Sequence, residues 1–401
     1  MSSPAVAAPY SRAVVNAMRK LYPESLAESW DNTGLLLEAP FDPLRRQMNS
    51  VLLTIDLTRA VADEAIERND SIIVSYHPII FRGLKSLTLK DPQQQTLLRL
   101  AAEGISVYSP HSAIDAAPGG LNDWLADIIT GTPATADEAT GDVAPFGPST
   151  YSSSKPHSVP PSISEKKTSE SYFPSHIPPS PSKRPTYMLQ HHPSHLNTPQ
   201  EQQEQALKLT STPHIRRPVI PFPAASPDTG SGRLVQLADP VPLPEIIDRI
   251  ALGLGNPKGF PVAVPQGRDV RDVMVRRIAI WAGSGGGGFK ELMEREEEGV
   301  DLFFTGEMAH HDALAAIERG CCVVCLFHSN SERGFLAGVL KGKLEKTLKE
   351  EWDRLRTEER RSLQQSASDE LLEALDDDHV EVHVSEADRD PYGIMVSKAD
   401  V

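Results

Sequence analysis

Short apolar runs alternate with amphipathic segments in the first part of the chain. The pattern predicts helices at residues 10–21, 58–68, 93–102 and 121–129 and strands at 35–37, 51–55, 71–76 and 105–108. Thr58 is expected to cap the second of these helices. Strands that alternate with helices are typical of βαβ units around a buried, largely parallel sheet.

The same alternation returns near residue 232. It predicts strands at 277–281, 301–304, 321–327 and 380–384 and helices at 245–254, 289–298, 311–319, 332–350 and, with frayed ends, 354–378. We therefore expect two α/β domains, which comprise residues 1–130 and 232–401.

The segment between these parts, residues 131–231, has another composition. It is rich in Ser, Pro, His and Gln and lacks apolar periodicity, so it buries too little surface to offset the entropy of ordering. We predict a disordered insertion that is able to bind several protein partners. Its histidines are expected to be scattered and solvated: His157, His176, His191, His192, His195 and His214.

The length of 401 residues allows two or three domains and a large core. The net charge of −15 argues against generic nucleic-acid binding, which depends on neutralising phosphates. The chain shows neither an apolar run of about 18 residues, as a membrane span needs, nor a leader at its start. We expect a cytoplasmic protein, with nuclear and mitochondrial pools as alternatives.

All three cysteines, Cys321, Cys322 and Cys325, fall in one apolar segment. A buried core strand explains them better than half of a zinc site, because no second cysteine pair completes such a site. This usage indicates a reducing compartment.

Three apolar runs each end at a histidine. These are His77, His111 and His328, and a carboxylate follows the last two by four residues, as Asp115 and Glu332. Ligands of α/β sheets collect outside the carboxyl ends of the strands, so convergence of the three runs would create a metal site. The nitrogen and oxygen donors suit zinc, manganese, iron or nickel.

Each of these residues also has a simpler interpretation. His77 is alternatively a core histidine, and His328 with Glu332 a surface pair. Their spacing directly after an apolar strand favours the metal hypothesis, because it places both side chains on one helical face. Asp115 is either a ligand or part of an Asx-turn, and His111 either ligates or supports a ligand.

Two further segments follow strands of the second part. The glycine run 283–288 is either a phosphate-binding helix start or a flexible turn, and it matches neither the dinucleotide nor the P-loop pattern. Glu307, His310 and His311 either act as acid–base groups at the same pocket or cap a helix.

Six segments together resemble one known family: Glu28–Leu35, Ser75–Phe81, Ser109–Gly120, Ala282–Gly286, Thr305–Glu307 and His328–Glu332. They resemble the Nif-three-like (Ngg-interacting factor three) family, also described as GTP cyclohydrolase I type 2-like. The resemblance covers residues 10–130 and 232–350 and the segment Asp388–Pro391.

The resemblance implies two α/β domains that face a cleft, two divalent metal ions between them, and a toroidal homohexamer. The implied ligands are His77, Asp115, His328 and Glu332. Tyr76 departs from the His-His-Pro of many bacterial members and looks like the eukaryotic branch. A phenol is a poor ligand unless ionised, so one metal is weak, absent or held through His111.

Two functions follow as hypotheses. The first is a metal-dependent hydrolase of a nucleotide or phosphoester, in which two ions about 4 Å apart activate water and Glu307 or His311 assists proton transfer. The alternative is a non-enzymatic interaction or transcription-regulatory protein. It predicts partner binding that survives metal removal.

Overall fold

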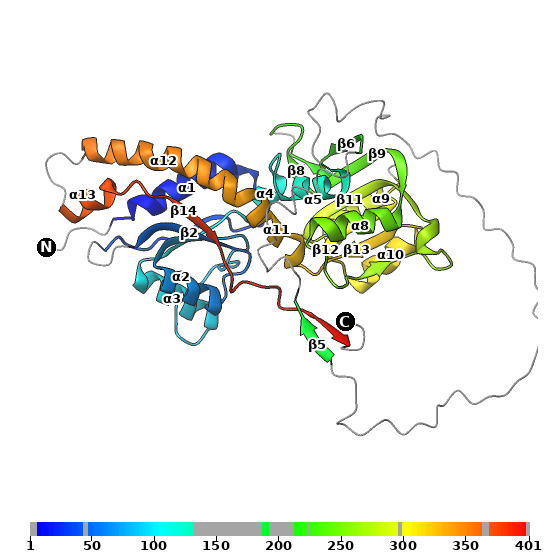
Figure 1. Cartoon of the computed structure of the whole chain (residues 1–401), viewed down its shortest axis with the longest axis horizontal. Helices are drawn as coiled ribbons and strands as arrows, with labels where there is room; N and C mark the ends of the chain where they lie inside the picture. The colour runs from blue at the N-terminus through cyan, green and yellow to red at the C-terminus, as the bar shows by residue number, and fades with distance from the viewer. Residues whose placement is uncertain are drawn as a thin grey trace, which may run out of the picture.

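The computed structural model describes residues 6–42, 47–131, 187–191, 212–222, 225–295, 299–362 and 369–397. Two main sheets, each flanked by helices, lie side by side along the long axis of the molecule (Figure 1). This mixed α/β architecture agrees with the alternation of strands and helices in the sequence. Among the described residues, no helix combines the length and apolarity needed to cross a membrane.

The first sheet has the strand order β1-β4-β3-β2-β14, and only β1 runs antiparallel to its neighbour. Its strands are β1 (Gly34–Leu37), β4 (Ser106–Ser109), β3 (Asp70–Ser75), β2 (Met48–Thr54) and β14 (Glu381–Val384). Successive side chains of a strand point to opposite faces. Leu52 and Ile73 therefore pack on one face, while Leu53 and Val74 pack on the other.

Helices cover both faces of this sheet. The helices α2 (Arg59–Arg68) and α3 (Pro92–Glu103) cover one face, whereas α1 (Pro9–Leu21) and α12 (Lys341–Ser362) pack together over the other. Thr58 caps α2 as predicted, because its hydroxyl oxygen accepts a hydrogen bond from the amide of Val61.

The second sheet has the order β10-β13-β12-β11-β9-β6, in which β11, β12 and β13 are parallel and the outer pairings are antiparallel. Its strands are β10 (Val262–Ala263), β13 (Cys322–Cys325), β12 (Leu302–Glu307), β11 (Met274–Ser284), β9 (Arg233–Pro242) and β6 (His214–Arg217). The cysteines lie in or beside β13, as expected for a core strand.

The helices α5 (Leu121–Thr130) and α8 (Leu243–Gly253) pack on one face of the second sheet. The helices α9 (Gly286–Glu294) and α10 (His310–Glu318) pack on the other. Both sheets are therefore buried on two sides.

The chain after residue 340 returns to the first sheet, although the sequence grouped it with residues 232–401. β14 pairs in parallel with β2, and α12 packs on α1. The helix predicted at 332–350 is also divided. A 3₁₀ turn (Ser329–Ser331), α11 (Arg333–Phe335) and a π-helical turn (Leu336–Leu340) precede α12. Such π turns are frequent at functional sites.

Parts of the segment 131–231 are ordered where the sequence predicted disorder. β6 pairs with β9, β7 (Ile220–Pro221) pairs with β8 (Gly230–Ser231), and β5 (Tyr187–Gln190) pairs with β15 (Ile394–Ser397). His214 is buried rather than solvated. Its Nδ1 lies 2.9 Å from the Thr212 carbonyl oxygen and its Nε2 accepts from Arg216, so both ring nitrogens have a partner. His191 is half-buried, and His157, His176, His192 and His195 lie outside the described residues.

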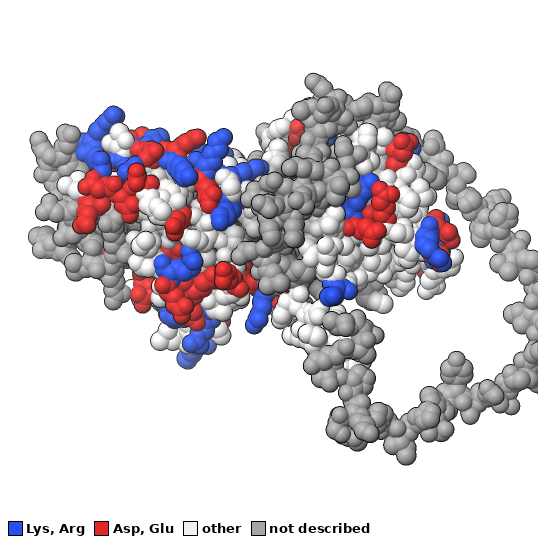
Figure 2. Space-filling model, viewed as in Figure 1, with Lys and Arg blue, Asp and Glu red and all other residues white. Residues whose placement is uncertain are grey.

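Figure 2 shows acidic and basic side chains interspersed over the half of the molecule that contains α2, α3 and α12. Neighbouring charges of opposite sign offset one another. The described residues on this view thus lack the extended basic surface that phosphate backbones require.

Candidate metal centre

A cavity of about 580 Å³ is lined by residues from both sheets. His77 follows β3 and His111 follows β4, whereas Gly283 lies at the end of β11 and His328 follows β13. The cavity therefore lies beside the carboxyl ends of strands, which is where α/β sheets collect ligands.

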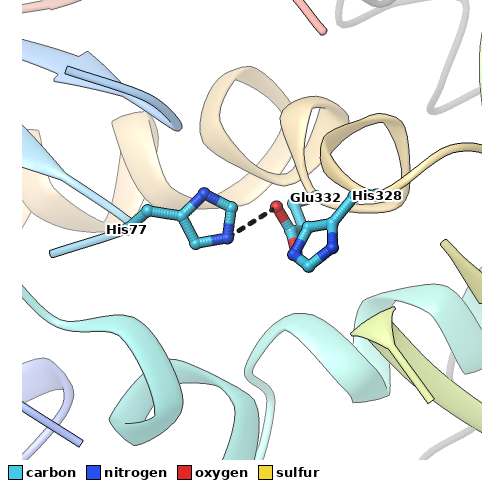
Figure 3. A group of neighbouring side chains, drawn as sticks. All are labelled: His77, His328 and Glu332. Atoms are coloured by element: carbon cyan, nitrogen blue, oxygen red, sulfur yellow. Dashed lines mark ion pairs between the residues drawn. The ribbon is translucent and has the colours of Figure 1, made fainter. Parts of the chain in front are cut away.

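Three side chains come closest together there: His77, His328 and Glu332 (Figure 3). Their donor atoms all lie within 4.8 Å of one another. The Nε2 atom of His77 is 3.4 Å from Oε2 of Glu332, and Nε2 of His328 is 3.7 Å from Oε1. The Glu332 carboxylate thus lies between two imidazoles that reach it from different sheets.

The Nδ1 atom of each candidate histidine contacts a carboxylate. Carboxylates in this position orient metal-ligating histidines and fix the tautomer that leaves Nε2 free. The pairs are His77 with Asp56 (2.9 Å), His328 with Glu307 (2.9 Å) and His111 with Asp31 (2.8 Å).

The electrostatics at His77 favour positive charge. Burial lowers the pKa of His77, but the Glu332 and Asp56 carboxylates outweigh burial and raise this pKa to about 10. The pKa of Asp56 is lowered despite its burial, because His77 and Arg333 stabilise the charged carboxylate. Two carboxylates around one point form an environment in which a cation is stabilised.

The burial of the Glu332 side chain is also consistent with a role as a metal ligand. It is only 1% exposed, and its Oε2 atom has no hydrogen-bond partner among the described residues. This atom lies 3.4 Å from Nε2 of His77, and a divalent cation between these two atoms would satisfy the buried oxygen. The two imidazoles and the carboxylate together suit a borderline divalent ion.

Glycine at position 283 leaves the room for this arrangement. Its φ of +61° is in the left-handed region, and a Cβ atom there would lie 2.6 Å from Oε1 of Glu332 and 2.9 Å from Nε2 of His328. The start of the glycine run therefore shapes the wall of the cavity beside the candidate ligands.

Backbone strain adjoins two of the histidines. His111 has a φ of +28°, and Phe327, which precedes His328, has a φ of +67°. Non-glycine residues rarely adopt such angles, and those that do cluster at functional sites.

His111 and Asp115 line the same cavity but do not belong to the group within 4.8 Å. The ring centroid of His111 is 5.3 Å from that of His77. The Tyr76 hydroxyl donates a hydrogen bond of 2.7 Å to Oδ1 of Asp115. Burial raises the pKa of Tyr76 well above its usual value and that of Asp115 to about 6, which keeps the Tyr76 phenol neutral as a hydrogen-bond donor.

The two residues expected to assist proton transfer lie apart from the lining. Glu307 is half exposed, and among the described residues its carboxylate contacts the site through Nδ1 of His328. His311 lies at the exposed start of α10, where its ring contacts that of His310, and it does not line the cavity.

The sequence did not single out the supporting residues Asp31, Asp56 and Arg333. Asp56 directly follows an apolar strand, which is the signal that identified His77. Arg333 is buried in a predicted helix, where its Nη2 donates to Asp56 (3.3 Å) and its Nη1 lies 2.5 Å from Oδ2 of Asp388. Only the folded arrangement reveals this link.

The fold and the site define a mixed α/β protein with a histidine and carboxylate cluster between two sheets. The chain belongs to the Duf34/NIF3 (NGG1p interacting factor 3) family, whose model matches residues 10–360. This confirms the resemblance that the motifs indicated.

Similar proteins and solved structures agree with this family assignment. The Schizosaccharomyces pombe protein NIF3 homolog is 37% identical over 328 residues, 82% of this chain and 86% of that protein. The Saccharomyces cerevisiae NGG1-interacting factor 3 is 30% identical over 338 residues, 83% and 89% of the two chains. A Bacillus cereus protein related to NIF3 has the same fold, with a TM-score of 0.56 at 19% identity over 98% of this chain and 100% of that one.

Proposed function

We propose that this protein binds two divalent metal ions in the cavity and hydrolyses a nucleotide or phosphoester there. One observation carries the proposal. The buried Glu332 carboxylate, with Oε2 lacking a hydrogen bond among the described residues, lies between the Nε2 atoms of two histidines that are each oriented by a carboxylate.

In this proposal His77, His328 and Glu332 hold one ion, and Asp115 with His111 holds the other. When bound, such ions supply Lewis-acid activation of a water molecule and of a phosphoryl oxygen. Asp56 and Glu307 contact Nδ1 of their histidines and so direct Nε2 of each ring at the site. No role is assigned to His311, because it lies outside the cavity lining.

The two positions would differ in affinity. The Tyr76 hydroxyl donates a hydrogen bond to Oδ1 of Asp115, so fewer oxygen atoms are free to coordinate an ion at the second position. We expect one tightly held ion and one that is lost more readily, and elemental analysis during graded dialysis against a chelator measures both.

The test of catalysis is a screen of the metal-loaded protein against nucleotides and phosphoesters. Turnover that disappears in His328→Ala and Glu332→Ala, with circular dichroism unchanged, supports the proposal. His379→Ala serves as the control, since this exposed histidine pairs with Glu381 away from the cavity. Turnover that is equal in all variants contradicts the proposal.

A second candidate function is protein interaction without catalysis. The S. cerevisiae relative is named NGG1-interacting factor 3, which says that this relative interacts with another protein. For the present chain this candidate predicts partner capture that persists after chelation and an absence of turnover in the substrate screen.

We further propose that the two sheets and their helices are two domains, and that the cavity is the cleft between them. We also propose that the chain assembles into a homohexamer. Its proposed compartment is the cytoplasm, with nuclear or mitochondrial pools as alternatives. Light scattering measures the assembly, and imaging of the tagged protein locates it. A monomeric mass would remove the hexamer from the proposal without affecting the metal site.

A further inference from the structure

Two exposed aromatic side chains line the cavity together with the candidate metal ligands. Trp30 is 60% exposed and Phe81 is 50% exposed, and their ring centroids are 6.1 Å apart. The ring of Trp30 also meets that of His111 edge-on at 5.9 Å. Large aromatic faces left open within a cavity are typical of a ligand-binding surface.

Hydrogen bonds hold the two loops that carry these rings. Asp31, the neighbour of Trp30, accepts hydrogen bonds from the amide (3.1 Å) and hydroxyl (2.5 Å) of Ser112. The side-chain amide of Asn32 donates to the carbonyl oxygen of Ile80, the residue before Phe81. The backbone at Trp30 and Phe81 is therefore positioned by the fold before any ligand arrives, which lowers the entropic cost of binding.

The charge of the lining restricts the ligand. None of the described residues around the cavity is a lysine or an arginine, whereas five are acidic: Glu28, Asp56, Asp115, Glu332 and Asp390. An anionic group would thus find no lysine or arginine there and would depend mainly on His77 and on bound metal ions. The aromatic pair, in contrast, offers stacking to a planar ring whatever its charge.

We propose that Trp30 and Phe81 form a stacking platform for a planar heteroaromatic ring of the substrate, such as a nucleobase, whose phosphate lies toward His77, His328 and Glu332. This inference rests on the proposed function and names its substrate class as nucleotides rather than simple phosphoesters. The volume of about 580 Å³ is within the range of small-molecule sites.

The test compares probes that share a phosphate and differ in the base. Binding of adenosine 5′-monophosphate, uridine 5′-monophosphate and ribose 5-phosphate to the metal-loaded protein is measured by calorimetry. Both nucleotides should bind about ten-fold or more tightly than ribose 5-phosphate, because each stacked base stabilises binding and stacking tolerates either base.

Variants locate the source of this preference. Trp30→Ala and Phe81→Ala should reduce nucleotide affinity about ten-fold and leave ribose 5-phosphate unaffected, whereas Trp30→Phe should retain most of the affinity. Tyr187→Ala is the matched control, since Tyr187 is an equally exposed aromatic residue outside the cavity lining, and it should bind as the parent protein does.

The outcomes separate the two claims. Metal content is determined on every sample. Equal binding of all three probes by the loaded protein, no nucleotide binding at millimolar concentration, or an unchanged preference in Trp30→Ala and Phe81→Ala each overturn the platform. Failure of the parent protein to take up metal overturns the proposed function instead.

Discussion

The Asp56 carboxylate serves two groups at once. Its Oδ1 lies 2.9 Å from Nδ1 of His77, and its Oδ2 accepts from Arg333 at 3.3 Å. The orientation of a candidate ligand therefore depends on a residue that does not belong to the cluster around Glu332. Asp56→Asn keeps the shape of the side chain and removes its charge.

We expect Asp56→Asn to weaken divalent metal binding by about 10–100-fold, the usual effect of losing an orienting carboxylate. Competition with a chromogenic chelator measures the affinity. Asp63→Asn is the control, because Asp63 lies on α2 and pairs with Arg99 (2.6 Å) outside the cavity lining. Equal affinity in the two variants would refute the role of Asp56.

At the residue scale, the sequence predicts the candidate metal ligands better than the residues that orient them. His77 and His328 were found because each follows an apolar run, and Glu332 because it lies four residues after His328. The structure brings their donor atoms within 4.8 Å of one another. Asp31, Asp56 and Arg333 act through contacts between distant segments, which no local pattern encodes. The exposure of His311 depends on how α10 is rotated on its sheet, and spacing alone does not fix this rotation.

At the scale of elements, the end of β11 and the start of α9 form the glycine-rich wall of the site. Gly283 has a positive φ and faces Glu332, whereas Gly287 lies in α9, where an added Cβ atom would meet no atom of the described residues within 4 Å. Position 283 therefore requires glycine for its backbone angle and its close contacts, whereas position 287 has room for a larger residue. Alanine substitution at each position distinguishes the two cases.

We expect Gly283→Ala to destabilise the fold by about 1–3 kcal/mol, through backbone strain and the collision with Glu332, and to reduce metal uptake. Gly287→Ala should instead stabilise by about 0.5–1 kcal/mol, since alanine is the better helix residue. Urea unfolding and metal analysis of both variants measure the difference. Similar effects at the two positions would show that Gly283 does not shape the site.

Among the elements, the buried parallel strands were the most predictable. β2, β3, β4, β11, β12 and β13 all fall on apolar runs that the sequence predicted. The short strands β5, β6 and β15 were not predicted, because few of their residues are buried and backbone pairing defines them. The interruption at Leu336–Leu340 was also missed, since its residues are as suited to an α-helix as to a π turn.

At the scale of the whole molecule, the chain after β14 ties the first sheet to the turn that carries His328. Oδ2 of Asp388 accepts from the amide of Ile55 (2.7 Å) and pairs with Arg333 (2.5 Å). Oδ2 of Asp390 accepts from the amide of Ser329 (3.1 Å) and from its hydroxyl (2.7 Å). The carboxyl-terminal segment is thus part of the support of the site.

Removal of the buried cation at position 333 tests this connection. Arg333 and Asp388 are each about 5% exposed or less, so Arg333→Met should destabilise by about 3–5 kcal/mol, because it leaves the Asp388 carboxylate buried without its partner. The double variant Arg333→Met with Asp388→Asn should recover part of the loss, which urea unfolding of the full cycle measures. Additive losses would show that the pair is not coupled.

Metal ions should stabilise the whole molecule, because their candidate ligands come from both sheets. At a free metal concentration of about 100 times Kd, binding adds about 2.7 kcal/mol, which corresponds to a rise in Tm of roughly 5 °C. Glu332→Gln should abolish this rise. Glu351→Gln is the control and should retain the rise in Tm. Glu351 is as buried as Glu332, but it pairs with Arg354 at 2.9 Å on α12, where this helix packs against α1. A thermal melt of each variant with and without a chelator makes the comparison, and a rise that persists in Glu332→Gln would place the stabilising ion elsewhere.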